Sequence, residues 1–169
     1  MKILSEKLPD LQALYVKQLR MLLSAEELII RGLPRMAETA TDNQLKQAFR
    51  SHLEETEQHA SRLRTILESL PGNHDPIKCK TVSALIDEAE DMIEDSAHES
   101  VRDAALIAAA QRIEHYEIAA YGAVRHFARV LKREQDVTLL SQTIEEEGNA
   151  DHHLTGIAER VNPTARKAA

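Results

Sequence analysis

The chain is 169 residues long and acidic, with 28 Asp and Glu against 21 Lys and Arg and a formal net charge of −7. This length predicts one domain with a sizeable core, and the charge argues against a nucleic-acid surface, because no basic stripe is available to neutralise phosphates. A single cysteine, Cys79, cannot form an internal disulfide, and no stretch approaches the roughly 20 apolar residues of a membrane span. The amino-terminal stretch becomes charged too early for a signal peptide, so we expect a cytoplasmic protein.

Leucine, alanine, glutamate and arginine recur throughout, and alternating β-branched residues are missing, so the sequence predicts an all-α fold. A first long helix is expected from about residue 8, with Pro9 in its opening turn, to residue 40. It should continue through Pro34 with a kink, since the helical pattern resumes beyond it. Residues 41–44 predict a turn that opens a second long helix, which ends at Pro71.

A polar connection follows, and residues 82–96 predict a short amphipathic helix. Two further long helices are expected over residues 100–132 and 136–160, the last stopped by Pro163. Short turns pair the long helices, and the long connection between the pairs carries the short helix. This order indicates a four-helix bundle with one long crossover. We expect a single domain over residues 1–162 and a disordered tail over residues 163–169.

Several acidic residues share the apolar stripes of the long helices instead of lying on the opposite faces. This follows from counting about 100° of rotation per residue along each helix. The acids placed on a stripe in this way are Glu26 in the first helix, Glu114 and Glu117 in the third, and Glu147 and Asp151 in the fourth.

The second long helix leaves its inward acid open. His59 lies on its stripe, with Glu55 at one border and Glu57 at the other, whereas Glu54 points away. A weak internal repeat favours Glu55, because sliding the second half of the chain onto the first lays Glu147 on it. His52, which also lies on the stripe, is the weaker histidine candidate.

Buried carboxylates at one level repel one another and lose hydration, so they need protons, arginine partners or a cation. Arg62 and Arg112 cannot balance so many acids, whereas a pair of divalent metal ions can. The alternative is that individual acids reach solvent at the edges of the stripes. The predicted metal ligands are therefore Glu26, Glu55, His59, Glu114, Glu117, Glu147 and Asp151.

Four motifs give the chain a family resemblance: AEEL with LPRMA in the first helix, HLEETEQHASRL in the second, RDAALIAAAQRIEHYEIAAYG in the third and TIEEEGNADHHL in the fourth. Through them the chain resembles the ferritin-like superfamily, specifically the YciE/YciF-type stress-associated proteins. The resemblance implies a four-helix bundle with a di-iron-type carboxylate centre, in a homodimer. The usual Glu-x-x-His pattern on two helices is absent, because Glu55 and His59 stand four apart and Ala150 follows Glu147 by three.

Two functional classes remain open. The first is redox chemistry at a divalent metal pair, for which the resemblance favours iron and leaves manganese open, with Fe(II) oxidation or removal of a small oxidant as the reaction. The second is a non-enzymatic structural or assembly protein whose core acids hold a stabilising metal. Iron storage in a large shell is disfavoured, because the resemblance points to dimers.

Overall fold

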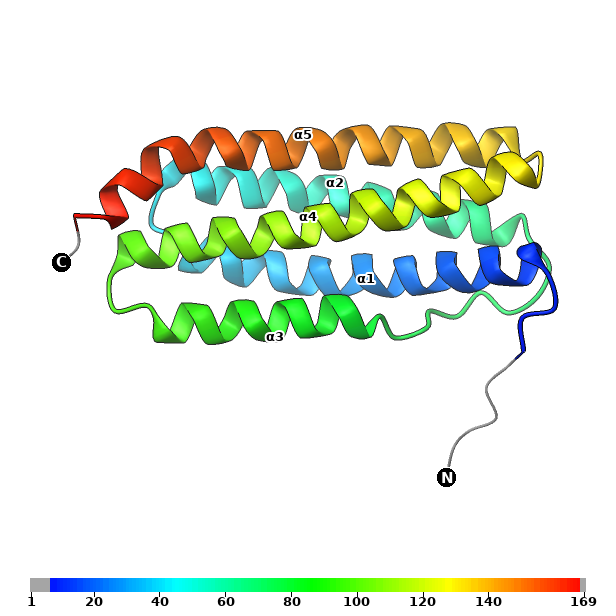
Figure 1. The fold of residues 1–169 in the computed structure, drawn as a ribbon, viewed down its shortest axis with the longest axis horizontal. Coiled ribbons are helices and arrows are strands. Elements are labelled where there is room, and N and C mark those ends of the chain that lie inside the picture. The colour runs from blue at the N-terminus through cyan, green and yellow to red at the C-terminus, as the bar shows by residue number, and fades with distance from the viewer. Residues whose placement is uncertain (1–6, 168–169) are drawn as a thin grey trace, which may run out of the picture.

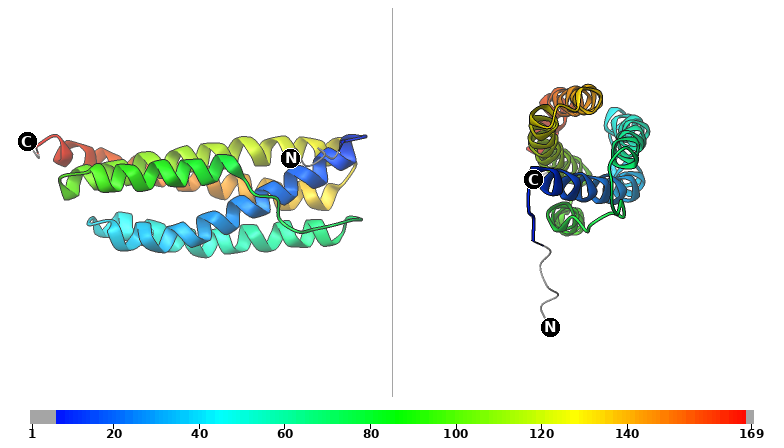
Figure 2. Two further views of the ribbon diagram at one scale, coloured as in Figure 1. Left: turned by 90° about the horizontal axis from the view of Figure 1, so that it is seen from below. Right: turned by 90° about the vertical axis from the view of Figure 1, so that its right-hand side faces the viewer.

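The described part of the chain, residues 7–167 of the computed structural model, consists of helices and their connections, without a strand. The helices are α1 (Leu11–Thr39), α2 (Asn43–Glu68), α3 (Lys80–Asp95), α4 (Glu99–Val130) and α5 (Glu134–Ala165). The four long helices form an elongated bundle, and α3 packs on its outside against α4 and α1 (Figures 1 and 2). The all-α fold and the bundle with a short helix in its crossover are thereby confirmed. No helix among these residues combines the length and apolar character needed to cross a bilayer.

The helices α1 and α2 begin at aspartates whose side chains cap them. Asp10 accepts a hydrogen bond from Ala13 N at 2.8 Å, so Pro9 precedes α1 instead of lying in its first turn. Asp42 accepts hydrogen bonds from two backbone N–H groups at the start of α2. Between these caps α1 runs unbroken through Pro34.

The last helix extends beyond its predicted end. The expected stop at Pro163 is wrong, because α5 continues through this residue to Ala165. Proline lacks one N–H donor but keeps a helical φ, and Arg166 N still donates to Asn162 O at 3.1 Å. Residues 168–169 of the expected disordered tail lie outside the described residues.

The core consists of two hydrophobic clusters separated by a polar layer. One cluster contains Ile29, Leu45, Leu106 and Leu154, and the other contains Leu19, Leu63, Val124 and Leu140, with further residues in each. On every long helix the buried glutamates and histidines fall between these two groups in sequence. Each fully buried leucine stabilises the bundle by roughly 1.5–3 kcal/mol, so the clusters can hold a polar layer that is unfavourable by itself.

One end of the bundle is fastened by Asp103 of α4, which is buried. Its carboxylate accepts hydrogen bonds from Thr41 N at 2.8 Å, Thr41 Oγ1 at 2.6 Å and Asp42 N at 2.8 Å. This carboxylate therefore holds the α1–α2 turn against α4.

We expect Asp103→Ala to destabilise the fold by about 2–4 kcal/mol, because it leaves the donors of the α1–α2 turn without their acceptor. The measurement is thermal unfolding followed by circular dichroism. Asp91→Ala, at an exposed position on α3, is the control and should leave the midpoint nearly unchanged. An equal midpoint for both variants would contradict the role of Asp103.

Candidate metal centre

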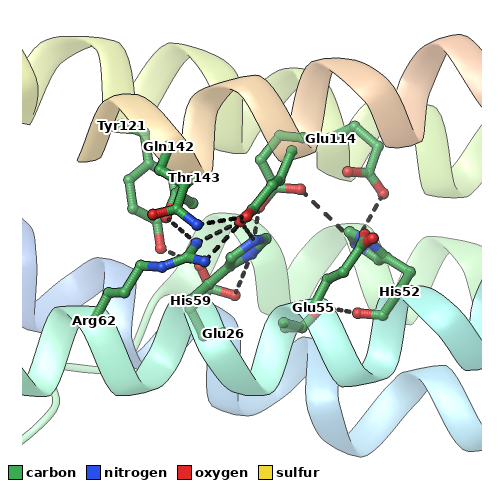
Figure 3. A network of polar contacts seen from close by, with 12 residues as sticks. Glu26, His52, Glu55, His59, Arg62, Glu114, Tyr121, Gln142 and Thr143 are labelled. Atoms are coloured by element: carbon green, nitrogen blue, oxygen red, sulfur yellow. Dashed lines mark hydrogen bonds and ion pairs between the residues drawn. The ribbon is translucent and has the colours of Figure 1, made fainter. Parts of the chain in front are cut away.

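The polar layer at mid-bundle is built from all four long helices. Its members are Glu26 of α1, His52 and His59 of α2, Glu114 and Glu117 of α4, and Glu147 of α5. Taken as whole residues, none is more than 7% exposed, and Glu26, His59, Glu117 and Glu147 are completely buried. Figure 3 shows several of these side chains pointing toward one another between the helices.

The layer divides into two groups that share Glu147. The first group is Glu26, His59 and Glu147, and the second is His52, Glu114, Glu117 and Glu147; in each, the possible ligand atoms lie within 4.8 Å of one another. Glu147 Oε1 lies 2.9 Å from His59 Nδ1, whereas Glu147 Oε2 lies 3.9 Å from His52 Nε2. The two oxygens of one carboxylate thus face different histidines, an arrangement suited to bridging two cations.

Many polar atoms of the layer have no hydrogen-bond partner within residues 7–167. These atoms include both oxygens of Glu117 and Glu147, Glu26 Oε2, Glu114 Oε2 and both ring nitrogens of His52. Leaving a buried polar group unsatisfied costs roughly 1–3 kcal/mol, and more when it is charged. Carboxylate and imidazole donors are those that iron, manganese and zinc accept, so these residues fit a metal pair.

Without a cation, three of the carboxyl groups favour the protonated form, because their pKa values are raised. Burial, followed by the charge of Glu147, raises the pKa of Glu26 to about 8. The same two causes raise the pKa values of Glu114 and Glu117 well above the ordinary range. The layer therefore stores protons that a metal ion would displace.

Glu147 and His59 form a buried ion pair within this protonated layer. Burial alone would raise the pKa of Glu147, but His59 and His52 hold that pKa below its ordinary value. Burial alone would lower the pKa of His59, but the adjacent carboxylate of Glu147 raises it to about 9. Glu147, the shared residue, is thus the one glutamate of the layer whose pKa is lowered and not raised.

A second ring of residues orients the ligand atoms. His59 Nε2 lies 2.9 Å from Glu146 Oε2, and Arg62 and Gln142 both donate to Glu146. Arg62 holds the pKa of Glu146 below its ordinary value against the effect of burial, and an ionised carboxylate can only accept. Nε2 of His59 must therefore carry a proton, and Nδ1 is the ring nitrogen that faces the centre. On the other side, Tyr121 donates to Glu26 Oε1.

We expect Glu146→Gln to weaken metal binding about ten- to a hundredfold, because it removes the carboxylate that fixes the ring of His59. Isothermal titration of metal-free protein measures the change. Glu145→Gln is the control, because Glu145 is exposed and its substitution removes the same charge from the same helix. Equal affinities for the two variants would show that His59 needs no partner.

Most of the predicted ligands lie together in this layer. The structure brings together Glu26, His59, Glu114, Glu117 and Glu147, and it adds His52, which sequence reasoning ranked as the weaker histidine. It does not bring Glu55 or Asp151 into either group. Glu146 was missed altogether, although the inward-facing Arg62 was a signal that an acid should lie opposite.

The prediction that α2 aims a carboxylate at the core is corrected. The buried face of α2 includes His52, Thr56 and His59, and the side chain of Glu55 projects to one side of that face. The side chain of Glu55 is 49% exposed, and Glu54 and Glu57 are exposed as well. α2 therefore contributes the predicted His59 together with His52, and none of its carboxylates joins either donor group.

Asp151 lies at the edge of the bundle instead of its centre. Its position four residues after Glu147 rotates it by about 40° toward α4. There it accepts a hydrogen bond from Gln111 Nε2 at 3.0 Å and lies 3.5 Å from His115 Nε2. Asp151 thus joins α5 to α4 outside the candidate centre.

Residues 10–167 match the family described as "Domain of unknown function (DUF892)". The chain belongs to this family. It is 41% identical to Protein YciF of Escherichia coli strain K12 over 146 residues, which cover 86% of this chain and 87% of YciF. The YciE/YciF-type resemblance is therefore confirmed.

The solved structures of two similar proteins share the fold of this chain. The crystal structure of the E. coli stress protein YciF matches with a TM-score of 0.87 and 37% identity, covering 92% of this chain and 98% of YciF. YcfI of Rhodopseudomonas palustris, described as a candidate structural protein, matches with a TM-score of 0.86 and 35% identity, covering 90% and 98%. The bundle arrangement is thus common to these proteins.

Proposed function

We propose that this DUF892 protein holds a pair of divalent metal ions at mid-bundle and uses them to consume a small oxidant. The observation that carries the proposal is the position of Glu147, which lies between two groups of buried donors with one oxygen toward each histidine. A buried carboxylate with a purely structural role needs only one group of hydrogen-bond or ion-pair partners. A carboxylate shared by two donor groups suits two cations.

Iron is the favoured metal and manganese the alternative, on the ferritin-like resemblance of the motifs. A redox-active pair would supply electrons to O2 or peroxide, with Fe(II) oxidation as the reaction type. The description of YciF as a stress protein supports this reading. Glu146 and Tyr121 orient the ligands, and the two hydrophobic clusters exclude water from both ends of the layer.

The test begins with metal-free protein, titrated with Fe(II) without oxygen, and ends with addition of peroxide or O2. We expect two ions per chain, one for each donor group, and faster loss of Fe(II) than in buffer. Metal binding without any gain in that rate would reject the redox role. Absence of metal binding would reject the centre itself.

We expect Glu117→Ala to lower the bound metal per chain while the protein stays helical, because both oxygens of Glu117 lack partners among the described residues. Elemental analysis and circular dichroism measure the two quantities. Glu38→Ala, at an exposed position of α1, is the control. Unchanged metal content would remove Glu117 from the ligand set.

A structural role is the second candidate, favoured by the description of the relative YcfI. In that case the metal ions would stabilise the bundle without redox turnover, and the helical surface would serve assembly, with a homodimer as the proposed form. Chelation separates the two candidates. It should lower the melting temperature in both, but it should abolish oxidant consumption only for the redox protein.

A further inference from the structure

A cavity of about 150 Å³ lies between α2 and α5, on one side of the candidate centre. Its inner wall includes His52 and Glu114, both members of the buried layer. Apolar side chains, among them Phe49 and Leu154, line part of the remainder. The cavity therefore connects a face of the bundle with the ligand atoms at its middle.

The polar groups on the inner wall are buried and unpartnered. The side chain of His52 is 9% exposed and that of Glu114 is 4% exposed. Both ring nitrogens of His52 and Glu114 Oε2 lack a hydrogen-bond partner in the part of the chain that the structure describes. Donor atoms that are desolvated and unpaired can bind a cation that reaches them.

Glu55 marks the outer end of the same cavity. Its half-exposed carboxylate lies 3.5 Å from His52 Nδ1, and His52 Nε2 lies 3.3 Å from Glu114 Oε1 (Figure 3). Three donor groups thus follow one another from the solvent to the buried layer. Such a series lets a hydrated cation exchange its waters for protein ligands one at a time.

We propose that this cavity is the port through which divalent metal ions reach the buried centre, with Glu55 as the first residue to capture them. The inference rests on the proposed metal centre and adds the route to it. Carboxylates at both ends of the series favour a cation over an anion. The ends of the bundle are closed by the two hydrophobic clusters, which a hydrated ion would not cross.

The test is the rate at which metal-free protein takes up Co(II), followed by stopped-flow visible absorption as protein ligands replace water. We expect Glu55→Gln to slow uptake about tenfold at low ionic strength, with the final Co(II) content unchanged. Glu54→Gln is the matched control, because Glu54 is an exposed neighbour that does not line the cavity. Equal rates for the two variants would overturn the port.

A second variant tests the route independently of charge. Ala150 lines the cavity, and Ala150→Leu should slow both uptake and release of Co(II) without changing the amount bound at equilibrium. Unchanged rates in this variant, or a lower final Co(II) content in Glu55→Gln, would overturn the assignment. Failure of the native protein to bind Co(II) at all would instead reject the metal centre, so the two failures are distinguishable.

Discussion

Replacing Glu147 with Gln is expected to reduce metal binding at both positions of the centre, to less than one ion per chain. Glu147 is the one residue present in both donor groups. It is also the one glutamate of the layer whose pKa is lowered, because His59 and His52 hold that pKa below its ordinary value. The amide of glutamine keeps the shape but carries no charge, so neither ion would retain its shared ligand.

The comparison that sharpens this expectation is Glu114→Gln, because Glu114 belongs to only one donor group. Its loss should leave about one ion per chain, as measured by elemental analysis of desalted protein. Glu159→Gln, at an exposed position of α5, should retain the full content. If Glu147→Gln and Glu114→Gln retained the same amount of metal, Glu147 would not be a shared ligand.

The inward position of Glu26, Glu114, Glu117 and Glu147 could be predicted from sequence for a simple reason. A long helix in a bundle has one buried side, and the leucines and alanines on it define its direction over many turns. An acid in the middle of such a stripe points toward the core and away from solvent. The four glutamates each lie in the middle of their stripe, and the structure buries all of them.

The α2 ligands could not be fixed in the same way. The sequence left Glu54, Glu55 and Glu57 open, and the internal repeat favoured Glu55. Helical counting placed His52 on the apolar stripe and Glu55 only at its border, and the structure buries His52 and leaves Glu55 half exposed. The internal repeat was therefore the misleading signal, because a residue at the border of a stripe can turn to solvent while its neighbours on the stripe stay buried.

The partnership of Glu146 with His59 and Arg62 illustrates another limit. Glu146 precedes the stripe residue Glu147, and helical counting places it well to one side. It reaches the histidine only because α5 lies beside α2 and Arg62 holds the carboxylate in place. Contacts between side chains on neighbouring helices thus require the structure, whereas the burial of single stripes does not.

The metal-free protein is expected to lose stability as the pH rises from about 5 to 9, while its affinity for metal increases. Glu26 has a pKa of about 8 in the folded chain against an ordinary value of 4.5, so the folded state holds a proton that the unfolded state has released. His59 has a pKa of about 9 against 6.5 and acts in the same direction. Both contributions are complete at low pH and disappear as the pH passes the folded values.

Metal binding reverses this dependence, because an ion must displace the protons of the groups that ligate it. Each displaced proton should increase the metal affinity about tenfold per pH unit within this window. The measurements are melting temperatures with and without Mn(II) between pH 5.5 and 8.5, and calorimetric titrations in buffers of different ionisation enthalpy, which count the protons released. Glu147 and Glu146 do not interfere, because their lowered pKa values affect stability only below this window. The contradicting result is a difference in melting temperature, with and without Mn(II), that stays constant with pH. No buried carboxyl group would then lose a proton when the metal binds, and Glu26 would lie outside the ligand set.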